Sequence, residues 1–410
     1  MGILMTLKQR IRTLQAKGEA FTKDSDKLFQ GTYTLAFVLA MVMSFISPRY
    51  LPWEFKNPLW WTSIGLSGFV FVWSGYRHQW PRLHKIALGV TLLSLLLLWR
   101  EPSASMATFF LLSVAVDRTD RQLIRRFFTA KLVIACLVFF FYLKGYLPDG
   151  QTPQVGEMDK FRYSYGFGPP NSLAMFMLSL AIDYILMAKK GRSLLEILVL
   201  ALWACLIYAV TDSQIVFYSF VVITLAYLFK PFLSQYFVRG SVILSIVAVI
   251  FICGVTFSYW FQPQHPLLVF VNRIVTGRLA NAHQYLEVTP IGLFPQNVPW
   301  LSYPDGVLIT NENFYVDALL RNGLIAYLLF PLMIAAEVIR KRFSYFHMIF
   351  ILLAFGIAMI ESYGVDITMM SILLFPYFAQ PLASEPNQTP AEERLSQPYS
   401  RVQRRFKART

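Results

Sequence analysis

Charged residues are scarce in this 410-residue chain, at 15% of the sequence, whereas soluble globular domains carry roughly a quarter. With 56% hydrophobic residues and a mean hydropathy of +0.49, this scarcity excludes an ordinary soluble enzyme and a disordered chain. The three cysteines, Cys136, Cys205 and Cys253, all fall inside apolar runs, which argues against a disulfide framework and a thiolate metal site. The composition is that of a polytopic membrane protein.

Recognisable devices for binding nucleotides and metals are lacking as well. The chain has no Gly-rich phosphate loop followed by Lys-Ser/Thr, no GxGxxG motif and no HExxH motif. We therefore expect no nucleic-acid partner, no cofactor and no metal site. If the chain handles a diphosphate, cationic side chains of the protein must neutralise it.

Long apolar runs are abundant instead. A helix that crosses a bilayer needs about 20 mostly apolar residues, fewer when polar ends reach the interface. Runs of this kind, bounded by charges, Gly or Pro, predict twelve membrane spans at residues 28–46, 59–75, 83–99, 103–116, 127–146, 171–188, 193–210, 213–229, 241–257, 314–338, 345–360 and 365–379.

The basic residues are distributed unevenly over the connections. The amino-terminal segment, the even-numbered connections and the tail hold 28 of the 37 Lys and Arg. Because such residues are retained on the cytoplasmic side, both termini are predicted to be cytoplasmic. We expect an all-α polytopic membrane protein of about 12 transmembrane helices over residues 28–382, preceded by a basic amphipathic segment (1–27) and followed by a disordered basic tail (383–410).

Two predicted outer loops, 147–170 and 258–313, are long, and long ordered loops are usually functional. Arginine on this face runs against the insertion bias. A guanidinium donates two parallel hydrogen bonds to phosphate oxygens and stays charged. Arg162, Arg273 and Arg278 are therefore candidates for binding a lipid-linked diphosphate. Pairing with loop carboxylates or lipid headgroups is the simpler alternative.

The second loop also supplies two candidate catalytic residues. Residues 266–286 carry apolar positions at helical spacing, which predicts a helix on the outer leaflet. His283 on this segment can exchange a proton near neutral pH. Glu312 stands where the loop meets the membrane, and burial there suits a carboxylate to accept a proton from a hydroxyl. The alternative for His283 is an isolated surface histidine. The alternative for Glu312 is an ordinary acid at a helix start, stabilised by the helix dipole.

Three further residues have mainly structural interpretations. Asp317 and Arg321 are four apart in a predicted helix, so they can form an ion pair on one face. Asn171 directly follows two prolines, which predicts a helix N-cap, with a ligand role as the second interpretation.

Three motifs follow one another through the predicted outer loops and their helix ends. They are Arg162-Tyr-Ser-Tyr-Gly-Phe-Gly-Pro-Pro-Asn171, Thr276-Gly-Arg-Leu-Ala280 followed by His283, and Glu312-Asn-Phe-Tyr315. Their order and placement resemble the Wzy-type polysaccharide polymerases of Gram-positive bacteria, within the O-antigen ligase and polymerase superfamily. The resemblance covers roughly residues 28–382. The family's Gly-His-Pro-Asn reads Gly-Pro-Pro-Asn here, ending at Asn171, so only His283 can supply a histidine.

The resemblance implies a metal-independent glycosyltransferase of the GT-C type in the bacterial cytoplasmic membrane, with a large outer loop before the last three helices. Such enzymes transfer the growing glycan from undecaprenyl diphosphate to a hydroxyl of a newly flipped repeat unit, here expected with inversion. Carried onto this chain, Arg162 and Arg278 hold the diphosphate, and Glu312 with Asn313 and Tyr315 lies near the catalytic opening. The implied partners are the lipid-linked oligosaccharide, the bilayer, a flippase and a chain-length regulator.

Other functions stay open on the sequence. A glycan ligase or a SEDS-type polymerase shares many spans and one large outer loop, although SEDS motifs are not found. A flippase for lipid-linked repeats is the main non-enzyme alternative. The predicted spans offer no string of ionisable groups of the kind that coupled transporters use, which disfavours it. A non-catalytic assembly protein is disfavoured by the basic outer loops.

Overall fold

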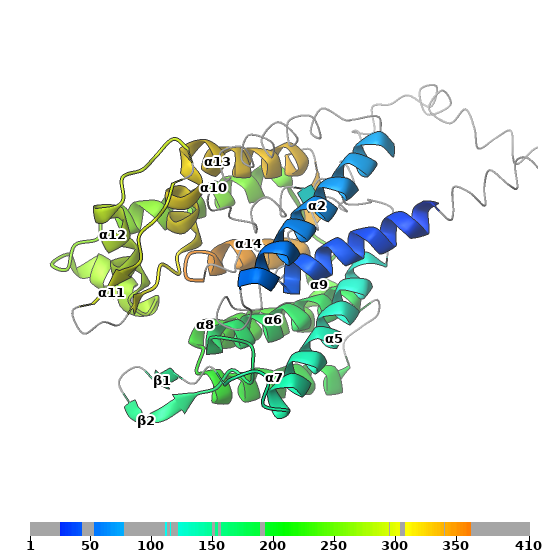
Figure 1. Cartoon of the computed structure of the whole chain (residues 1–410), viewed down its shortest axis with the longest axis horizontal. Coiled ribbons are helices and arrows are strands. Elements are labelled where there is room, and N and C mark those ends of the chain that lie inside the picture. The colour runs from blue at the N-terminus through cyan, green and yellow to red at the C-terminus, as the bar shows by residue number, and fades with distance from the viewer. Residues whose placement is uncertain are drawn as a thin grey trace, which may run out of the picture.

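The computed structural model describes residues 25–42, 53–77, 111, 112, 115, 122–149, 152–154, 157–188, 193–294, 296–303, 308–339 and 341–361, and these are mostly helical (Figure 1). Several predicted features lie outside the described residues: the first 24 residues, the tail 383–410, the spans 83–99 and 365–379, and most of 103–116.

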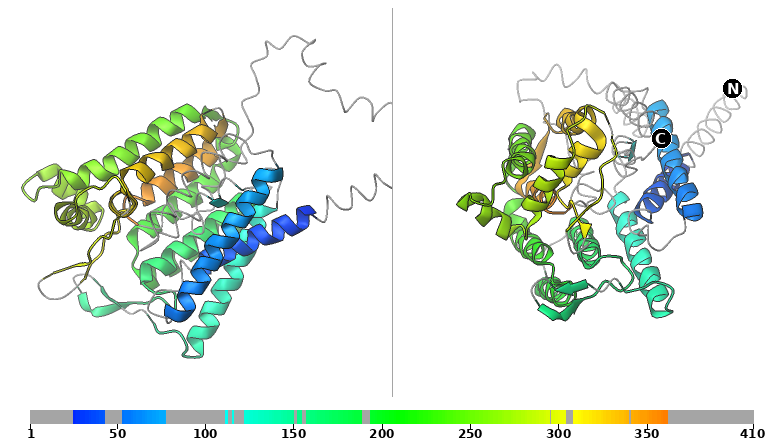
Figure 2. Two further views of the ribbon diagram at one scale, coloured as in Figure 1. Left: turned by 45° about the horizontal axis from the view of Figure 1, so that its top comes forward. Right: turned by 60° about the vertical axis from the view of Figure 1, so that its left-hand side comes forward.

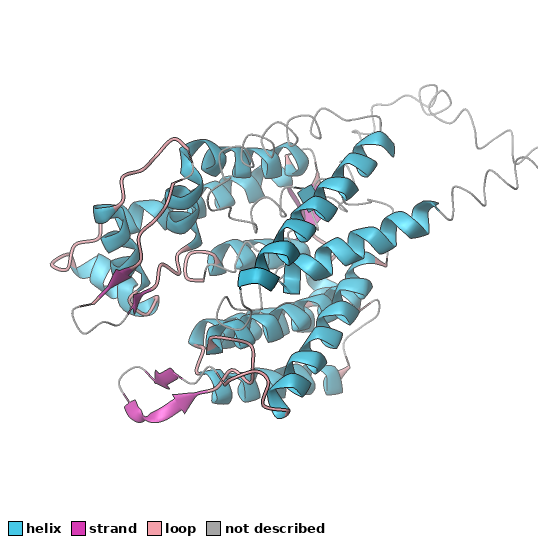
Figure 3. Cartoon of the chain, viewed as in Figure 1, coloured by secondary structure: helices cyan, strands magenta, loops and turns pink. Residues whose placement is uncertain are grey.

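The described helices are one over residues 25–42, α2 (Trp53–Arg77), α5 (Leu123–Leu143), α6 (Pro170–Met187), α7 (Leu194–Thr211), α8 (Gln214–Leu228), α9 (Lys230–Leu233), α10 (Gly240–Tyr259), α11 (Pro266–Ile274), α12 (Arg278–Val288), α13 (Phe314–Val338) and α14 (Tyr345–Ile357). Short antiparallel strand pairs join some of the connections (Figure 3): β1 (Thr152–Gln154) with β2 (Glu157–Arg162), β3 (Phe237–Arg239) with β6 (Arg342–Ser344), and β4 (Leu301–Ser302) with β5 (Leu308–Ile309).

Four helices, α5, α6, α7 and α10, are long and apolar enough to cross a membrane. Most of α6 is buried, whereas the other three expose much of their apolar surface. On α7, for example, Leu198, Leu202 and Leu206 are each more than half exposed. Exposing apolar faces of this extent to water is unfavourable, so they mark surfaces that contact lipid or another apolar partner. These features indicate a membrane protein, while the total of twelve spans stays a prediction.

The helices α10, α13 and α14 lie side by side (Figure 2). A β-carbon at Gly254 of α10 would come within 2.3 Å of the Tyr315 ring, so glycine allows α13 to approach this closely. The Tyr315 hydroxyl donates a hydrogen bond of 2.7 Å to the carbonyl of Phe355 in α14. One side chain of α13 thus fixes both of its neighbours.

A fully buried ion pair joins α5 to α6. Lys131 Nζ lies 2.8 Å from Asp183 Oδ2, and both side chains have no exposed area. Lys131 lies inside both the predicted span 127–146 and the observed α5, and its side chain is buried in the bundle. A charge among apolar side chains requires a partner of opposite sign, which Asp183 provides.

Two helices predicted as continuous are interrupted. Residues 266–286 form α11 and α12, because Thr276 and Gly277 turn the chain with φ values of 53° and 85°. The α13 helix is broken at Gly323, where φ is 77° and ψ is 165°. The connection before β4 fills this second break: the amide of Leu324 donates to the carbonyl of Gly292 at 2.9 Å.

Substituting Gly323 by alanine should destabilise the protein. Its backbone conformation is available almost only to glycine, and an added β-carbon would lie 2.5 Å from the carbonyl carbon of Phe294. We expect a loss of about 2–3 kcal/mol, measured by unfolding of the solubilised protein. Gly65→Ala is the control, because its β-carbon would meet no described atom within 4 Å and alanine favours a helix. Equal stability of the two variants would contradict this account.

Candidate functional site

Residues from five separate segments converge at one end of the helices. Arg162 ends β2 just before α6, Thr211 ends α7, Arg278 opens α12, Glu312 precedes α13 and Glu361 follows α14. Successive spanning helices run in opposite directions, so these positions share one end of the bundle. The charge pattern predicts this end to be the outer one.

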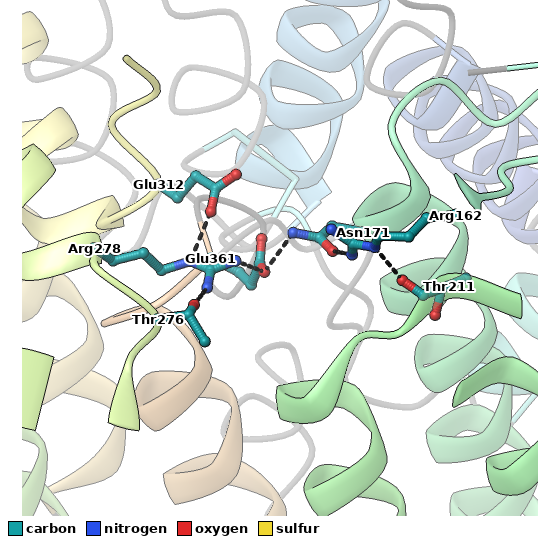
Figure 4. Close-up of polar contacts among 7 residues, drawn as sticks. All are labelled: Arg162, Asn171, Thr211, Thr276, Arg278, Glu312 and Glu361. Carbon is teal, nitrogen blue, oxygen red and sulfur yellow. Dashed lines mark hydrogen bonds and ion pairs between the residues drawn. The ribbon is translucent and has the colours of Figure 1, made fainter. Parts of the chain in front are cut away.

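Glu361 lies at the centre of this convergence (Figure 4). One of its oxygens, Oε1, is 2.6 Å from Nη2 of Arg278 and accepts a hydrogen bond of 3.1 Å from Nδ2 of Asn171. Only 2% of its side chain is exposed. A single buried carboxylate oxygen thus connects the α6 segment to the α12 segment.

Arg278 uses all three guanidinium nitrogens. Besides Glu361, its Nε lies 2.6 Å from Oε2 of Glu312, and its Nη1 donates to Oγ1 of Thr276. The left-handed turn at Gly277 directly precedes it and starts α12. The arginine is therefore held in one orientation between two carboxylates.

Arg162 is fixed on the opposite side of the cluster (Figure 4). Its Nε donates to the carbonyl of Thr211 and its Nη2 donates to Oδ1 of Asn171, both at 2.5 Å. Burial lowers the pKa of the Arg162 guanidinium, while Asp212 and Glu361 raise it. Arginine titrates so far above neutrality that the side chain keeps its charge.

The side chain of Asp149 fixes the backbone that follows Arg162. Oδ1 of Asp149 accepts hydrogen bonds from the amides of Ser164 at 3.0 Å and Tyr165 at 3.1 Å. Tyr165 has a φ of 46°, an unusual conformation for a bulky residue. The connection from β2 to α6 is therefore rigidly positioned, and with it Arg162.

We call Arg162, Asn171, Arg278, Glu312 and Glu361 the arginine–glutamate cluster. Burial raises the pKa of Glu361 from its ordinary 4.5 to about 8; Arg278 and Arg162 oppose this rise and Glu312 adds to it. The buried Glu361 carboxyl therefore takes up a proton more readily than an exposed glutamate. With Glu361 protonated, the cluster contains two positive charges and one negative charge, an arrangement suited to an anion.

Asn171 differs from its sequence interpretation. The N-cap of α6 is Pro169, and Asn171 is the second helical residue. Proline at the first helical position, Pro170, is preorganised for this start. The Asn171 amide is therefore not used as a cap, and it bridges Arg162 to Glu361.

Asn313 and Tyr315, next to Glu312, have fully buried side chains that form structural hydrogen bonds. Asn313 caps α13 by accepting from the amide of Tyr315, and its Nδ2 donates to the carbonyl of Gly254 at 2.8 Å and to Ser258 Oγ at 3.1 Å. These residues fix the start of α13, and through it they position Glu312.

The predicted ion pair of Asp317 and Arg321 is confirmed. Oδ1 of Asp317 lies 2.7 Å from Nε of Arg321 on one face of α13. Arg321 also stands over the ring of Trp300, 5.8 Å from its centroid. These contacts support a structural role in holding the β4 segment.

His283 and Arg273 are not part of the cluster. Nδ1 of His283 lies 3.0 Å from the Ser258 carbonyl, and Nε2 lies 3.3 Å from Glu287. Five helical residues separate it from Arg278, a rotation of roughly 140° about the helix axis. Arg273 is exposed near the end of α11, and its side chain makes no hydrogen bond or ion pair with described residues.

The sequence interpretation missed Glu361. The predicted span ended at residue 360, which left Glu361 as the first residue of a short connection. The available signal was an isolated acid between two long apolar runs, because an ionisable group at such a place calls for a functional explanation.

No protein-family model, curated protein or solved structure matches the chain. Within the described ranges, no group of three His, Cys, Asp or Glu side chains is placed to hold a metal ion.

The raised pKa of Glu361 predicts a dependence of stability on pH. Between about pH 4.5 and 8 the folded protein retains a proton that the unfolded chain has released, so the free energy of unfolding should fall as pH rises. Glu361→Gln, which resembles the protonated form, should reduce this slope in thermal unfolding from pH 5 to 9. Glu287→Gln, at an exposed position, should leave it unchanged. Parallel curves for wild type and Glu361→Gln would disprove the assignment.

Proposed function

We propose that this chain is a polysaccharide polymerase that joins undecaprenyl-diphosphate-linked oligosaccharide repeats on the outer face of the bacterial cytoplasmic membrane. In this proposal it has about twelve spans, cytoplasmic termini and a GT-C-like arrangement. The observation that carries the proposal is that two arginines from separate predicted outer loops are connected to one buried carboxylate, Glu361. Arg278 contacts it directly, and Arg162 is connected through the Asn171 amide. The resemblance of the surrounding motifs to Wzy-type polymerases adds to it.

The cluster has the components that a diphosphate site requires. Two guanidiniums are held in place before substrate binds, so little reorganisation is needed. Phosphate oxygens would replace Glu312 as a partner of Arg278, while Glu361 would keep its contact with Nη2. A protonated Glu361 would reduce the repulsion between the cluster and the incoming anion.

The proposed reaction is a single displacement. The hydroxyl oxygen of the acceptor sugar forms a bond to the anomeric carbon of the donor glycan, and the bond from that carbon to the diphosphate oxygen breaks. The electron pair leaves with the lipid diphosphate, whose charge Arg162 and Arg278 stabilise. Glu312 accepts the hydroxyl proton, since its side chain is 31% exposed while that of Glu361 is 2% exposed.

Glu361 acts in this scheme as a positioning residue. It holds Arg278 through Nη2 and Arg162 through the Asn171 amide. Guanidiniums supply the charge stabilisation that a divalent cation supplies in other glycosyltransferases. A purified preparation should therefore elongate glycan in the presence of a chelator, and loss of activity on chelation would count against the mechanism.

Arg278→Ala and Arg162→Ala should each reduce elongation by about 10²–10³-fold, because each removes a charge that stabilises the leaving group. The proteins should stay abundant, since Glu361 already takes up a proton readily. Lysine at either position should rescue little, because it lacks the planar fork. The assay measures chain length from lipid-linked repeats with purified protein in micelles.

Lys144→Ala is the matched control, an exposed basic residue at the end of α5 on the predicted outer side. It should elongate glycan at the wild-type rate. A micelle does not separate two compartments, so no flipping can occur in it. Elongation in micelles would therefore exclude a flippase as the sole function. Transfer of finished glycan to another acceptor, without elongation, would identify a ligase. Normal chain length in both arginine variants would reject the proposed site.

A further inference from the structure

Three tyrosines pack against one another near the end of β2, which carries Arg162. The rings of Tyr163 and Tyr165 are nearly parallel, with centroids 6.1 Å apart and an angle of 14°. Tyr142, from the end of α5, meets Tyr165 edge-on at 5.5 Å. We call Tyr142, Tyr163 and Tyr165 the tyrosine shelf. Of its three members, Tyr163 directly follows Arg162 in the chain.

The shelf is held rigidly. The amide of Tyr163 donates to the carbonyl of Val210 at 3.0 Å, and the amide of Tyr165 donates to Asp149 at 3.1 Å. The left-handed backbone at Tyr165 costs about 1–3 kcal/mol, so the surrounding contacts must enforce it. At Gly166 an added β-carbon would come within 3.2 Å of the Tyr142 Cβ. This conformation is imposed before any ligand binds.

Part of the shelf remains open. Tyr163 is 37% exposed, although its backbone is fixed. A large aromatic ring that is ordered but not covered is suited to bind a flat partner. The face of an aromatic ring carries partial negative charge, which attracts the partially positive C–H groups on the apolar face of a pyranose.

We propose that the tyrosine shelf binds a pyranose ring of the lipid-linked oligosaccharide by stacking on Tyr163. This inference rests on the proposed function and extends it from the diphosphate to the glycan. Tyr163 is the residue after Arg162, whose guanidinium belongs to the cluster. The shelf therefore contacts a sugar while the cluster holds the phosphates.

A membrane anchor is the alternative for exposed aromatics near a bilayer. Tyr146 has that character: it lies just beyond α5, is 74% exposed and contacts Phe141 outside the shelf. Tyr163 differs because it is fixed in a rigid connection next to a charged cluster. The pair Tyr163 and Tyr146 therefore separates the two explanations.

The test measures binding of the lipid-free repeat oligosaccharide, released by mild acid from the lipid-linked pool of the source cells, to the full chain in micelles. Saturation-transfer NMR should show magnetisation transfer to sugar C–H protons with wild type. Tyr163→Ala should weaken binding about 10-fold, whereas Tyr163→Phe should stay within about 2-fold because the ring is kept. Tyr146→Ala should bind like wild type.

Elongation assays on the same variants separate this inference from the polymerase assignment. Tyr163→Ala should raise KM for lipid-linked repeats about 10-fold with kcat within about 2-fold. Elongation with an unchanged KM would overturn the shelf and leave the polymerase in place. Tyr163-dependent binding without elongation would support the shelf and remove the polymerase. Equal loss of membrane insertion in Tyr163→Ala and Tyr146→Ala, with unchanged affinity, would make both residues anchors and overturn the shelf.

Discussion

One oxygen of Glu361 is shared between the guanidinium of Arg278 and the amide of Asn171, and this contact connects the two parts of the site. Asn171 lies in the first turn of α6, the most buried of the four long apolar helices, whereas Arg278 belongs to the segment between α10 and α13. A buried carboxylate is costly unless it is paired or protonated. The spacing of Arg162 and Arg278 therefore depends on the protonation and pairing of one acid.

The cluster is complete before a ligand enters. Each arginine is already engaged by oxygen atoms of the protein, which keeps it from adopting other rotamers. In the proposed function, phosphate oxygens would take the place of Glu312 beside Arg278, and they carry more charge than one carboxylate. Fixed cations of this kind stabilise a developing anion without moving during the reaction. The adjoining tyrosines are ordered in the same way, by backbone contacts.

Local features of the structure followed from local sequence patterns. The predicted spans at 171–188, 193–210 and 213–229 match α6, α7 and α8 closely, because apolar runs of that length have few alternatives in a membrane. Features that depend on contacts between distant parts of the chain could not be predicted from local sequence patterns. Asn171 and Glu361 are 190 residues apart, and no spacing rule relates them. The Asn-Gly pair at Gly323 is typical of a turn, but it lies within a long apolar run, which predicted an unbroken span over 314–338.

The break in α13 fixes the connection around Gly292 in place. The carbonyls of Gly292 and Leu293 accept hydrogen bonds from the amides of Leu324 and Ile325, where an unbroken helix would use its own carbonyls. Lifting this connection away would leave helix amides without acceptors inside the bundle. The stretch around Gly292 is thus a structural support of α13, and its displacement would expose the break in that helix.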